Sequence, residues 1–395
     1  MTTANNGRLS IRSGWKIWIP VLIGIAVAVY MIMSAIREEK FIADPNGNYE
    51  WVDNNQNGLV DFSDPSEFKL STCCGSYSRQ RFTDAIGKLD WGWMSVLGIF
   101  MAFVMMMVRD LAYMWRIRLL TEKRLTWRQS FRVIMIWEFA SAVTPGVVGG
   151  AAVAMFILNK EKIEMGRATA LVMITALLDE LFYILVVPIL LLIAGTAALF
   201  PIDLTKSIFG LDLHVVGLFW IAFSFIALIT FLLFFAVFVS PSSFGSFLIF
   251  ICRLPFLNRF SHRAERLKQD IIVTSAELKN KAFSFWVKAF MATAISWTAR
   301  FLVINFLLFS IVPFTDHLVI FARQLSMWVI LLVSPTPGGS GIAEFVFSGF
   351  LSDFVPFGLA GLFAVLWRLI SYYPYLLIGA IVLPRWLGGD DENRE

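Results

Sequence analysis

The chain alternates long apolar stretches with short polar ones along almost its whole length. The longest apolar stretches are Trp15–Ile36, Trp91–Val108, Ala168–Leu199, Leu213–Val239, Phe283–Val312 and Phe357–Leu383. Runs of about 20 apolar residues are long enough to cross a bilayer as a helix. The first stretch has a long apolar core and no small-residue cleavage site after it, so it predicts a span and not a signal peptide. The pattern therefore predicts about six full spans.

Two further apolar stretches, about 133–158 and 318–351, are interrupted by helix breakers. The breakers are Pro145, Gly146, Gly149 and Gly150 in the first stretch, and Pro337, Gly338, Gly339 and Gly341 in the second. Proline removes an amide donor, and glycine permits a chain reversal. A single span over the first stretch would also separate the basic segment 159–167 from the basic segment 109–132. We therefore expect two re-entrant helical hairpins, with ordinary kinked spans as the alternative.

The two halves of the chain repeat one pattern with opposite orientation. A span, a hairpin and a span follow one another over 91–199, and the same series recurs over 283–383. The tripeptide TPG stands at corresponding places, 144–146 and 336–338. Inverted repeats with interrupted helices are typical of transporters that bind their substrate at the midplane. The fold class predicted is an all-α polytopic membrane protein whose two broken hairpins meet near the midplane.

Composition and charge agree with this class. The chain is 58% hydrophobic and 16% charged, with a mean hydropathy of +0.71, whereas soluble domains are about a quarter charged. Basic residues collect at the N-terminus, over 109–132 and over 241–288, which predicts that these segments are cytoplasmic. The insert 37–90 is then extracytoplasmic, and both termini, including the tail 386–395, are cytoplasmic. We expect residence in a bacterial inner membrane.

The net charge of +4 is a local bias toward the inner leaflet and gives no indication of nucleic-acid binding. The segment 241–282 is either an amphipathic helix on anionic lipids or a solvated loop, and the sequence leaves both open.

Ionisable residues inside membrane segments are costly and are candidates for function. Acids stand at Glu138, Asp179, Glu180 and Glu344, and arginines at Arg300 and Arg368. Each acid could simply tie an arginine as a buried structural pair. As a set, with the glycine amides of the two breaks, they favour an anionic ligand. Arg300 and Arg368 are the first choices for a phosphate, because guanidinium groups bind it in a fixed fork.

Three segments carry a resemblance to a known family. AVTPGVVGG, SPTPGGSGIAE and LWRLISYYPYLLIGA resemble the lysylphosphatidylglycerol synthase transmembrane-region family over roughly residues 91–385. The resemblance implies a polytopic lipid translocase for anionic or head-group-modified lipids. It places family positions at Pro337, Gly338, Gly339, Gly341, Glu344 and Arg368.

The chain departs from the family in one span. Where the family has an ERLLD-like stretch, ITALLDELF keeps Asp179 but has Thr175 and Ala176 in place of Glu and Arg. The usual charge pair is therefore missing, or it is replaced by Glu180. The chain carries no synthase domain after its last span, so we expect no enzyme activity.

The insert 37–90 contains DNNQNGLVDFSD, which fits the template of a calcium loop. Its expected ligands are Asp53, Asn55, Asn57, the carbonyl of Leu59, Asp61 and Asp64. An Asn/Gly-rich surface turn is the alternative. No other cofactor is indicated, and the neighbouring Cys73 and Cys74 could be free or joined.

Three functions remain open. The first is a lipid translocase in which Glu344 or Asp179 compensates charge or relays a proton. The second is a membrane-embedded transferase on a lipid-linked substrate, and the third is an ion-coupled small-solute transporter. The sequence has no ATP-binding motif, so movement would be downhill, ion-coupled or driven by product removal. The expected partners are anionic membrane lipids, with a second copy of the chain or a separate lipid-modifying enzyme as further candidates.

Overall fold

The computed structural model describes residues 39–388 and six isolated positions between 26 and 37. The gaps within the longer range are 57, 63, 88, 90, 145, 201–204, 209–210, 253–260, 314, 333–338, 340–341 and 357–358. Most of the predicted first span, Trp15–Ile36, lies outside the described residues. So do Asn57, Pro145, Pro337, Gly338 and Gly341 of the predicted site residues.

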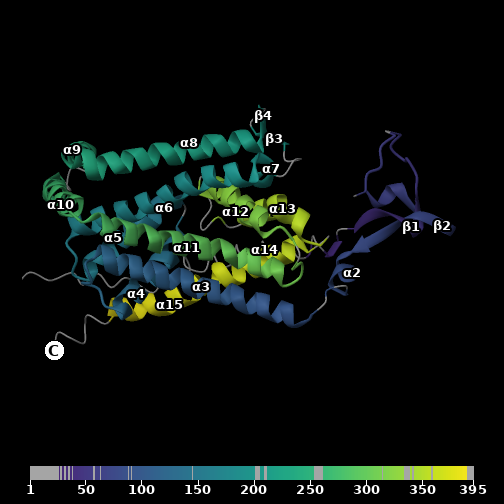
Figure 1. Cartoon of the computed structure of the whole chain (residues 1–395), viewed down its shortest axis with the longest axis horizontal. Helices are drawn as coiled ribbons and strands as arrows, with labels where there is room; N and C mark the ends of the chain where they lie inside the picture. Colours follow the sequence, from purple (N-terminus) through teal and green to yellow (C-terminus); the bar gives the residue numbers. More distant parts are fainter. Residues whose placement is uncertain are drawn as a thin grey trace, which may run out of the picture.

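The described chain is a bundle of helices, and this confirms the predicted all-α polytopic class (Figure 1). Among these residues, five helices are long and apolar enough to cross a membrane: Trp93–Leu120, Met165–Ala194, Val216–Val239, Phe283–Phe309 and Ala360–Leu383. The helices of the bundle are α3 (Trp93–Leu120), α4 (Trp127–Val143), α5 (Gly146–Lys160), α6 (Met165–Ala194), α7 (Thr196–Leu199), α8 (Val215–Phe234), the π-helical η3 (Phe235–Val239), α9 (Pro241–Cys252), α10 (Ser261–Lys279), α11 (Phe283–Phe309), α12 (His317–Leu332), α13 (Ile342–Leu351), the 3-10 turn η5 (Ser352–Phe354), α14 (Ala360–Ser371) and α15 (Tyr373–Gly388).

The insert forms a β-hairpin beyond one end of the bundle (Figure 1). Strands β1 (Glu39–Trp51) and β2 (Phe68–Arg81) pair antiparallel, with the 3-10 turn η2 (Pro65–Glu67) between them and helix α2 (Phe82–Gly87) after them. Phe41 stacks on Phe68 with ring centres 4.0 Å apart, which gives the hairpin a small core of its own. A second short hairpin, β3 (Thr205–Ile208) and β4 (Leu211–His214), connects α7 to α8.

Helix α3 is longer than predicted. The expected span ended at Val108, but the helix continues to Leu120 and ends where Glu122 and Lys123 adopt positive φ. Arg109 and Arg116, which the charge pattern placed in the cytoplasmic segment 109–132, are therefore helical and buried. The expected end of the span at Val108 was too early, because packing against α11, which lies along α3, shields these arginines from water. The side of the membrane that this segment faces stays a prediction.

The two interrupted stretches each form a pair of helices that reverses direction. Gln129, near the start of α4, donates to Glu161, just after α5, at 3.0 Å, so the two ends of the first pair meet. Arg323 of α12 donates to the carbonyl of Phe350 at the end of α13, at 2.9 Å, so the second pair also returns. Figure 1 shows the pairs at opposite ends of the bundle. Their re-entrant course in a membrane stays a prediction.

The last predicted span, Phe357–Leu383, is interrupted within its length. Helix α14 ends at Ser371 and α15 begins at Tyr373, with Tyr372 between them in a non-helical conformation. Pro374 has no amide hydrogen to donate, which favours a break at this point. Tyr372 fixes the break by donating from its hydroxyl to the carbonyl of Ala142 in α4, at 3.0 Å. The break of the last span therefore lies against the end of α4.

Candidate functional site

A pocket of about 290 Å³ lies inside the bundle, between the two helix pairs. Its wall comprises Tyr113 and Arg116 of α3, Ile134, Trp137, Glu138, Ser141 and Ala142 of α4 with Thr144, Ala151 of α5, Val172, Thr175, Ala176, Asp179 and Glu180 of α6, Trp297 and Arg300 of α11, Trp328 and Leu331 of α12, Gly339, Ala343 of α13, and Trp367, Arg368, Ser371, Tyr372 and Tyr375 of the last two helices. The wall thus draws on both breaks, and most of the sequence-predicted residues that the structure describes lie on it.

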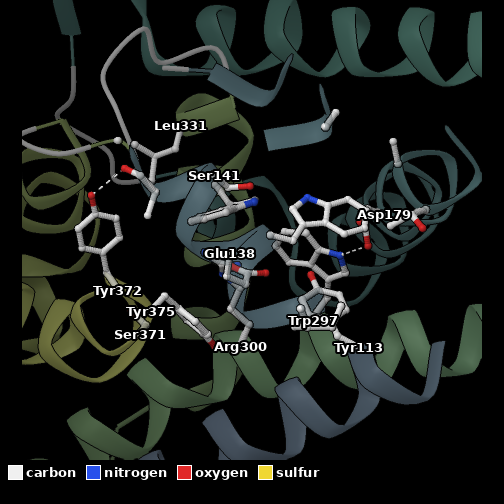
Figure 2. A pocket seen from close by; sticks show the side chains of 18 of the residues that line it. Tyr113, Glu138, Ser141, Asp179, Trp297, Arg300, Leu331, Ser371, Tyr372 and Tyr375 are labelled. Carbon is white, nitrogen blue, oxygen red and sulfur yellow. Dashed lines mark hydrogen bonds between the residues drawn. The ribbon is translucent and has the colours of Figure 1, made fainter. Parts of the chain in front are cut away.

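Asp179 is held by an arginine that sequence reasoning missed. Arg116 donates to both carboxylate oxygens of Asp179, at 2.5 and 3.3 Å, and to the hydroxyl of Thr293 at 3.0 Å. Trp297 adds an indole hydrogen bond to Asp179 at 2.8 Å (Figure 2). A carboxylate with three such donors is fully engaged, because bidentate guanidinium contacts are the strong form of ion pair. Asp179 is therefore a tie between α6, α3 and α11.

Glu138 is held in the same way by Arg109. Its carboxylate accepts from Arg109 at 2.7 Å, and Arg109 also donates to Asp110 at 2.9 Å and to the hydroxyl of Tyr375. Tyr375 in turn donates to Asp110 at 2.7 Å. The Arg109 side chain is 1% exposed, so its charge needs these partners to be tolerated inside the bundle. The network joins α3, α4 and α15.

Glu344 and Arg368, both predicted as site residues, pair with each other. Arg368 Nε donates to Glu344 Oε1 at 2.9 Å, and the side chains are 7% and 3% exposed. The Arg368 guanidinium also lies over the ring of Tyr372, 4.3 Å from its centre. This pair joins α13 to α14. Arg368 borders the pocket, whereas Glu344 lies behind it.

Arg300 differs from the other arginines of the pocket. Within the part of the chain that the structure describes, it forms no salt bridge, whereas Arg109, Arg116 and Arg368 each do. Its guanidinium lies over the rings of Trp328 and Trp297, 4.0 and 5.3 Å from their centres. Figure 2 shows Arg300 and Glu138 in the middle of the pocket, with Tyr372 toward one side and Asp179 toward the other. Arg300 thus presents a cation with aromatic support and, among the described residues, no carboxylate within salt-bridge distance.

Of the three carboxylates on the pocket wall, Glu180 is the one that forms no salt bridge with an arginine among the described residues. It lines the pocket, and its Oε2 is buried with no hydrogen-bond partner among the described residues. The hydroxyls of Thr175 and Tyr183, on the same helix, are also buried and lack described partners. Asp179 and Glu180 both border the pocket although they are adjacent in the chain. Asp179 turns to Arg116, and Glu180 does not.

The glycines of the two breaks serve different needs. A Cβ added at Gly150 would lie 2.2 Å from the Oγ of Ser141, so this glycine allows α5 to approach α4 closely. Gly339 has a φ of +69°, and a Cβ there would meet nothing closer than 3.8 Å. Glycine reaches positive φ at no steric cost. Gly146 begins α5 and Gly149 lies in its first turn. Gly150 thus provides space, and Gly339 provides conformation.

Sequence reasoning missed the arginines of α3 for an identifiable reason. Arg109 and Arg116 were counted only as part of the basic segment 109–132, yet with Tyr113 they are spaced by four and three residues, which places them on one helix face. The ring of Tyr113 lies 4.8 Å from the guanidinium of Arg109 and 4.6 Å from that of Arg116. This spacing in the sequence could have indicated that the charged residues form one buried stripe on an otherwise apolar helix.

The predicted calcium loop is organised around a glutamate outside the motif. Glu67 is completely buried and accepts from the indole of Trp51, the side-chain amide of Asn55 and the backbone amide of Asp61, at 3.0, 2.5 and 3.1 Å. Asp53 accepts from the amide of Gly58 at 2.9 Å. Across the described residues, no group of three or more acidic, His or Cys side chains gathers as a metal site. Calcium binding by Asp53, Asn55, Asn57, Leu59, Asp61 and Asp64 stays a prediction.

Comparison with known proteins agrees with the resemblance seen in the sequence. Residues 77–379 match the model of the family described as "Lysylphosphatidylglycerol synthase TM region". The chain is 24% identical over 321 residues to a "UPF0104 membrane protein" of Archaeoglobus fulgidus, which covers 77% of this chain and 90% of that relative. No solved structure matches the chain. The family match begins within β2, somewhat earlier than the sequence motifs indicated.

Proposed function

Because the chain belongs to the lysylphosphatidylglycerol synthase transmembrane-region family, we propose that it moves an anionic or head-group-modified lipid between membrane leaflets. The observation that carries this proposal is Arg300, a pocket cation with no described carboxylate partner. Arg300 is half-buried, and a guanidinium with no anion within salt-bridge distance is poorly compensated in a largely apolar surrounding. A lipid phosphate in the pocket would supply that anion through charge-assisted hydrogen bonds.

The position of the pocket supports movement through the protein. Its wall includes Thr144, next to the first break, and Gly339 of the second, and the two helix pairs lie at opposite ends of the bundle (Figure 1). A head group held between two interrupted helices could be released toward either side by displacement of one pair, as in transporters with broken helices. The acyl chains would stay in the lipid.

The two arginines favoured by the sequence have separate roles in this proposal. Arg368 is engaged by Glu344 in a nearly unexposed pair, and it stabilises the second hairpin against α14. Arg300 binds the phosphate. The four tryptophans of the pocket wall, Trp137, Trp297, Trp328 and Trp367, would cover the head group's apolar edges.

The other two functions stay alternatives. An ion-coupled small-solute transporter would use the same pocket and the same Arg300, with a soluble anion in place of a lipid. A membrane-embedded transferase would need a donor substrate beside the lipid. The experiment below separates the lipid from the soluble anion.

Mass spectrometry of lipids retained after gentle extraction tests the proposal on wild type, Arg300→Gln and Arg128→Gln. Arg128 is an exposed arginine at the start of α4, away from the pocket, so it controls for loss of one surface charge. We expect one anionic or modified lipid class to be enriched in wild type and Arg128→Gln, and to be lost in Arg300→Gln with the melting temperature unchanged. Bulk membrane lipid in all three proteins would contradict the proposal. Scrambling of a fluorescent lipid by the same proteins in liposomes would then show whether binding accompanies movement.

A further inference from the structure

The charged groups at the pocket balance. Counting the wall and its direct ion-pair partners, the guanidiniums are Arg109, Arg116, Arg300 and Arg368, and the carboxylates are Glu138, Asp179, Glu180 and Glu344. An anionic head group would add a negative charge to this set, and uncompensated charge inside a bilayer is costly. A proton on one carboxylate would offset that charge.

Among these carboxylates, Glu180 is the one on which a proton would displace the fewest hydrogen-bond donors. Glu138, Asp179 and Glu344 each accept from an arginine at 2.5 to 2.9 Å, and Asp110 accepts from Arg109 and Tyr375. A proton on any of these would displace a donor. Glu180 Oε2 has no described donor to displace.

The surroundings of Glu180 leave few other candidates. The titratable and charged side chains that line the pocket with it are Asp179 of α6, Tyr113 and Arg116 of α3, Glu138 of α4, Arg300 of α11, and Arg368, Tyr372 and Tyr375 of the last two helices. Helices α5 and α12 contribute only uncharged residues to the wall, and α7, α8 and η3, which also pack against α6, contain no ionisable residue. The charged helix α10 packs against the start of α6, where Asp270 lies beside Gly166 and Glu277 accepts from Arg167, and it contributes nothing to the wall. Tyr183, one helical turn beyond Glu180, is 1% exposed, and its hydroxyl has no hydrogen-bond partner within the described part of the chain.

We propose, on the basis of the proposed function, that Glu180 takes up a proton when an anionic head group binds Arg300 and releases that proton when the head group leaves. The phosphate brings a further negative charge into a pocket whose charged groups otherwise balance. Glu180, the wall carboxylate with no arginine partner among the described residues, then takes up a proton from water. Transport of the lipid anion is thereby coupled to transport of a proton in the same direction. Of the acids considered from sequence as proton relays, Glu344 and Asp179 are engaged by arginines and serve as ties.

Proton-linked binding is measurable by calorimetry on the full chain in lipid nanodiscs, with dihexanoyl phosphatidylglycerol as the probe. Titrations in two buffers of different ionisation enthalpy, at a series of pH values, give the number of protons taken up per bound lipid. We expect wild type to reach roughly one proton at its maximum, Glu180→Gln to bind without uptake, and Glu180→Asp to retain uptake. Equal uptake in wild type and Glu180→Gln would overturn the proposal.

The result distinguishes this inference from the proposed function. If the wild type and Arg300→Gln bind the probe equally or not at all, the proposed anion site is wrong and the coupling falls with it. If Arg300 is required for binding but no proton is taken up, only the coupling is wrong.

A second measurement needs no variant. Dicyclohexylcarbodiimide is apolar and modifies protonated carboxyl groups, and peptide mass spectrometry locates the product. We expect dihexanoyl phosphatidylglycerol to increase the modification of Glu180 in wild type at a given pH, while the adjacent Asp179 stays unmodified. Modification of Asp179 in preference to Glu180, or equal modification of Glu180 with and without the lipid, would contradict the proposal even if Glu180→Gln failed to fold.

Discussion

The first half of the repeat, from α3 to α6, brings more acids than arginines to the pocket, whereas the second half, from α11 to α15, brings more arginines than acids. The difference is clearest on α3 and α11, which lie along each other. Arg116 of α3 is neutralised by Asp179, and Arg300 of α11 has only aromatic neighbours among the described residues. Two similar helix arrangements thus carry opposite charge surpluses, and the proposed anion site lies in the second half while the proposed proton site lies in the first.

The largest effect is expected from breaking the enclosed tie of the second half. Arg368→Ala would leave Glu344, which is 3% exposed, charged and without its arginine. Removing one partner of a buried ion pair costs about 3–5 kcal/mol. Thermal unfolding in detergent should show a strongly destabilised protein with a low yield. The double variant Arg368→Met/Glu344→Met should recover much of the loss, and equal losses in both proteins would contradict a tie.

A smaller loss is expected from the tie of the first half. Glu138→Gln leaves Arg109 with Asp110 and Tyr375 as partners, and the Glu138 side chain is 22% exposed. We therefore expect destabilisation of about 1.5–3 kcal/mol, the range for hydrogen bonds to charged groups. Chemical unfolding of both variants under one condition would rank them. A loss for Glu138→Gln that exceeds that of Arg368→Ala would reverse the comparison between the halves.

Gly150 of the first half and Gly339 of the second are expected to be needed for different reasons, close packing and backbone conformation. Gly150→Ala should cost about 1–3 kcal/mol through overpacking, because its Cβ would lie 2.2 Å from Ser141 Oγ. Replacing Ser141 by Ala should recover part of this loss. Gly339→Ala should cost about 1 kcal/mol through its positive φ, with no recovery from any neighbouring substitution. Melting temperatures of the four proteins test both statements, and recovery of Gly339→Ala by a smaller Leu331 would argue against a conformational cause.

The smallest effect concerns pH and lies at the entry to the first hairpin. The Glu122 carboxyl accepts from Lys281 and from Arg167, both at 2.9 Å, and the Lys281 hydrogen bond and these two charges lower the pKa of Glu122 below its ordinary value. A lowered folded-state pKa means that the pair stabilises the fold above the unfolded-state pKa, near 4.5, and that this stabilisation is lost as the pH falls through the folded-state pKa.

We expect the free energy of unfolding of Glu122→Gln to fall slightly less steeply toward acid pH than that of wild type. The difference between the two proteins should be smaller in high salt than in low salt, because exposed ion pairs are weak and screened. Unfolding measured from neutral to acid pH, in low and high salt, checks this. An unchanged acid slope in Glu122→Gln would show that other carboxylates dominate there.

Much of the fold could be predicted from residue order. The apolar stretches identify the spans, and the Pro/Gly clusters locate the points where the helices are interrupted. These are local properties, because a run of apolar side chains or a proline acts on the residues next to it. The boundaries of the spans were less predictable. The end of α3 was placed at Val108, because a count of basic residues does not distinguish a buried arginine from an exposed one.

The sequence identified charged residues that the structure places at or behind the pocket, but not how they pair; their role as a site stays a prediction. Glu138, Asp179, Glu344, Arg300 and Arg368 were identified as costly charges, yet the sequence could not say which acid meets which arginine. Arg116 and Asp179 are 63 positions apart, and Arg109 and Tyr375 are 266 apart. Similarly, Glu67 lies outside the calcium-loop motif and reaches its centre only through the folding of the β-hairpin.

The sequence by itself determined that this is a polytopic helical membrane protein of one family with two interrupted stretches, because hydropathy, helix breaking and family motifs depend on neighbours along the chain. The tertiary structure alone decided that Arg109, Arg116 and Arg368 are neutralised while Arg300 and Glu180 face the pocket without ionic partners among the described residues. The physical reason is that the free energy of a buried charge is set by the few atoms within hydrogen-bond distance of it, and only the packing of distant helices brings those atoms there.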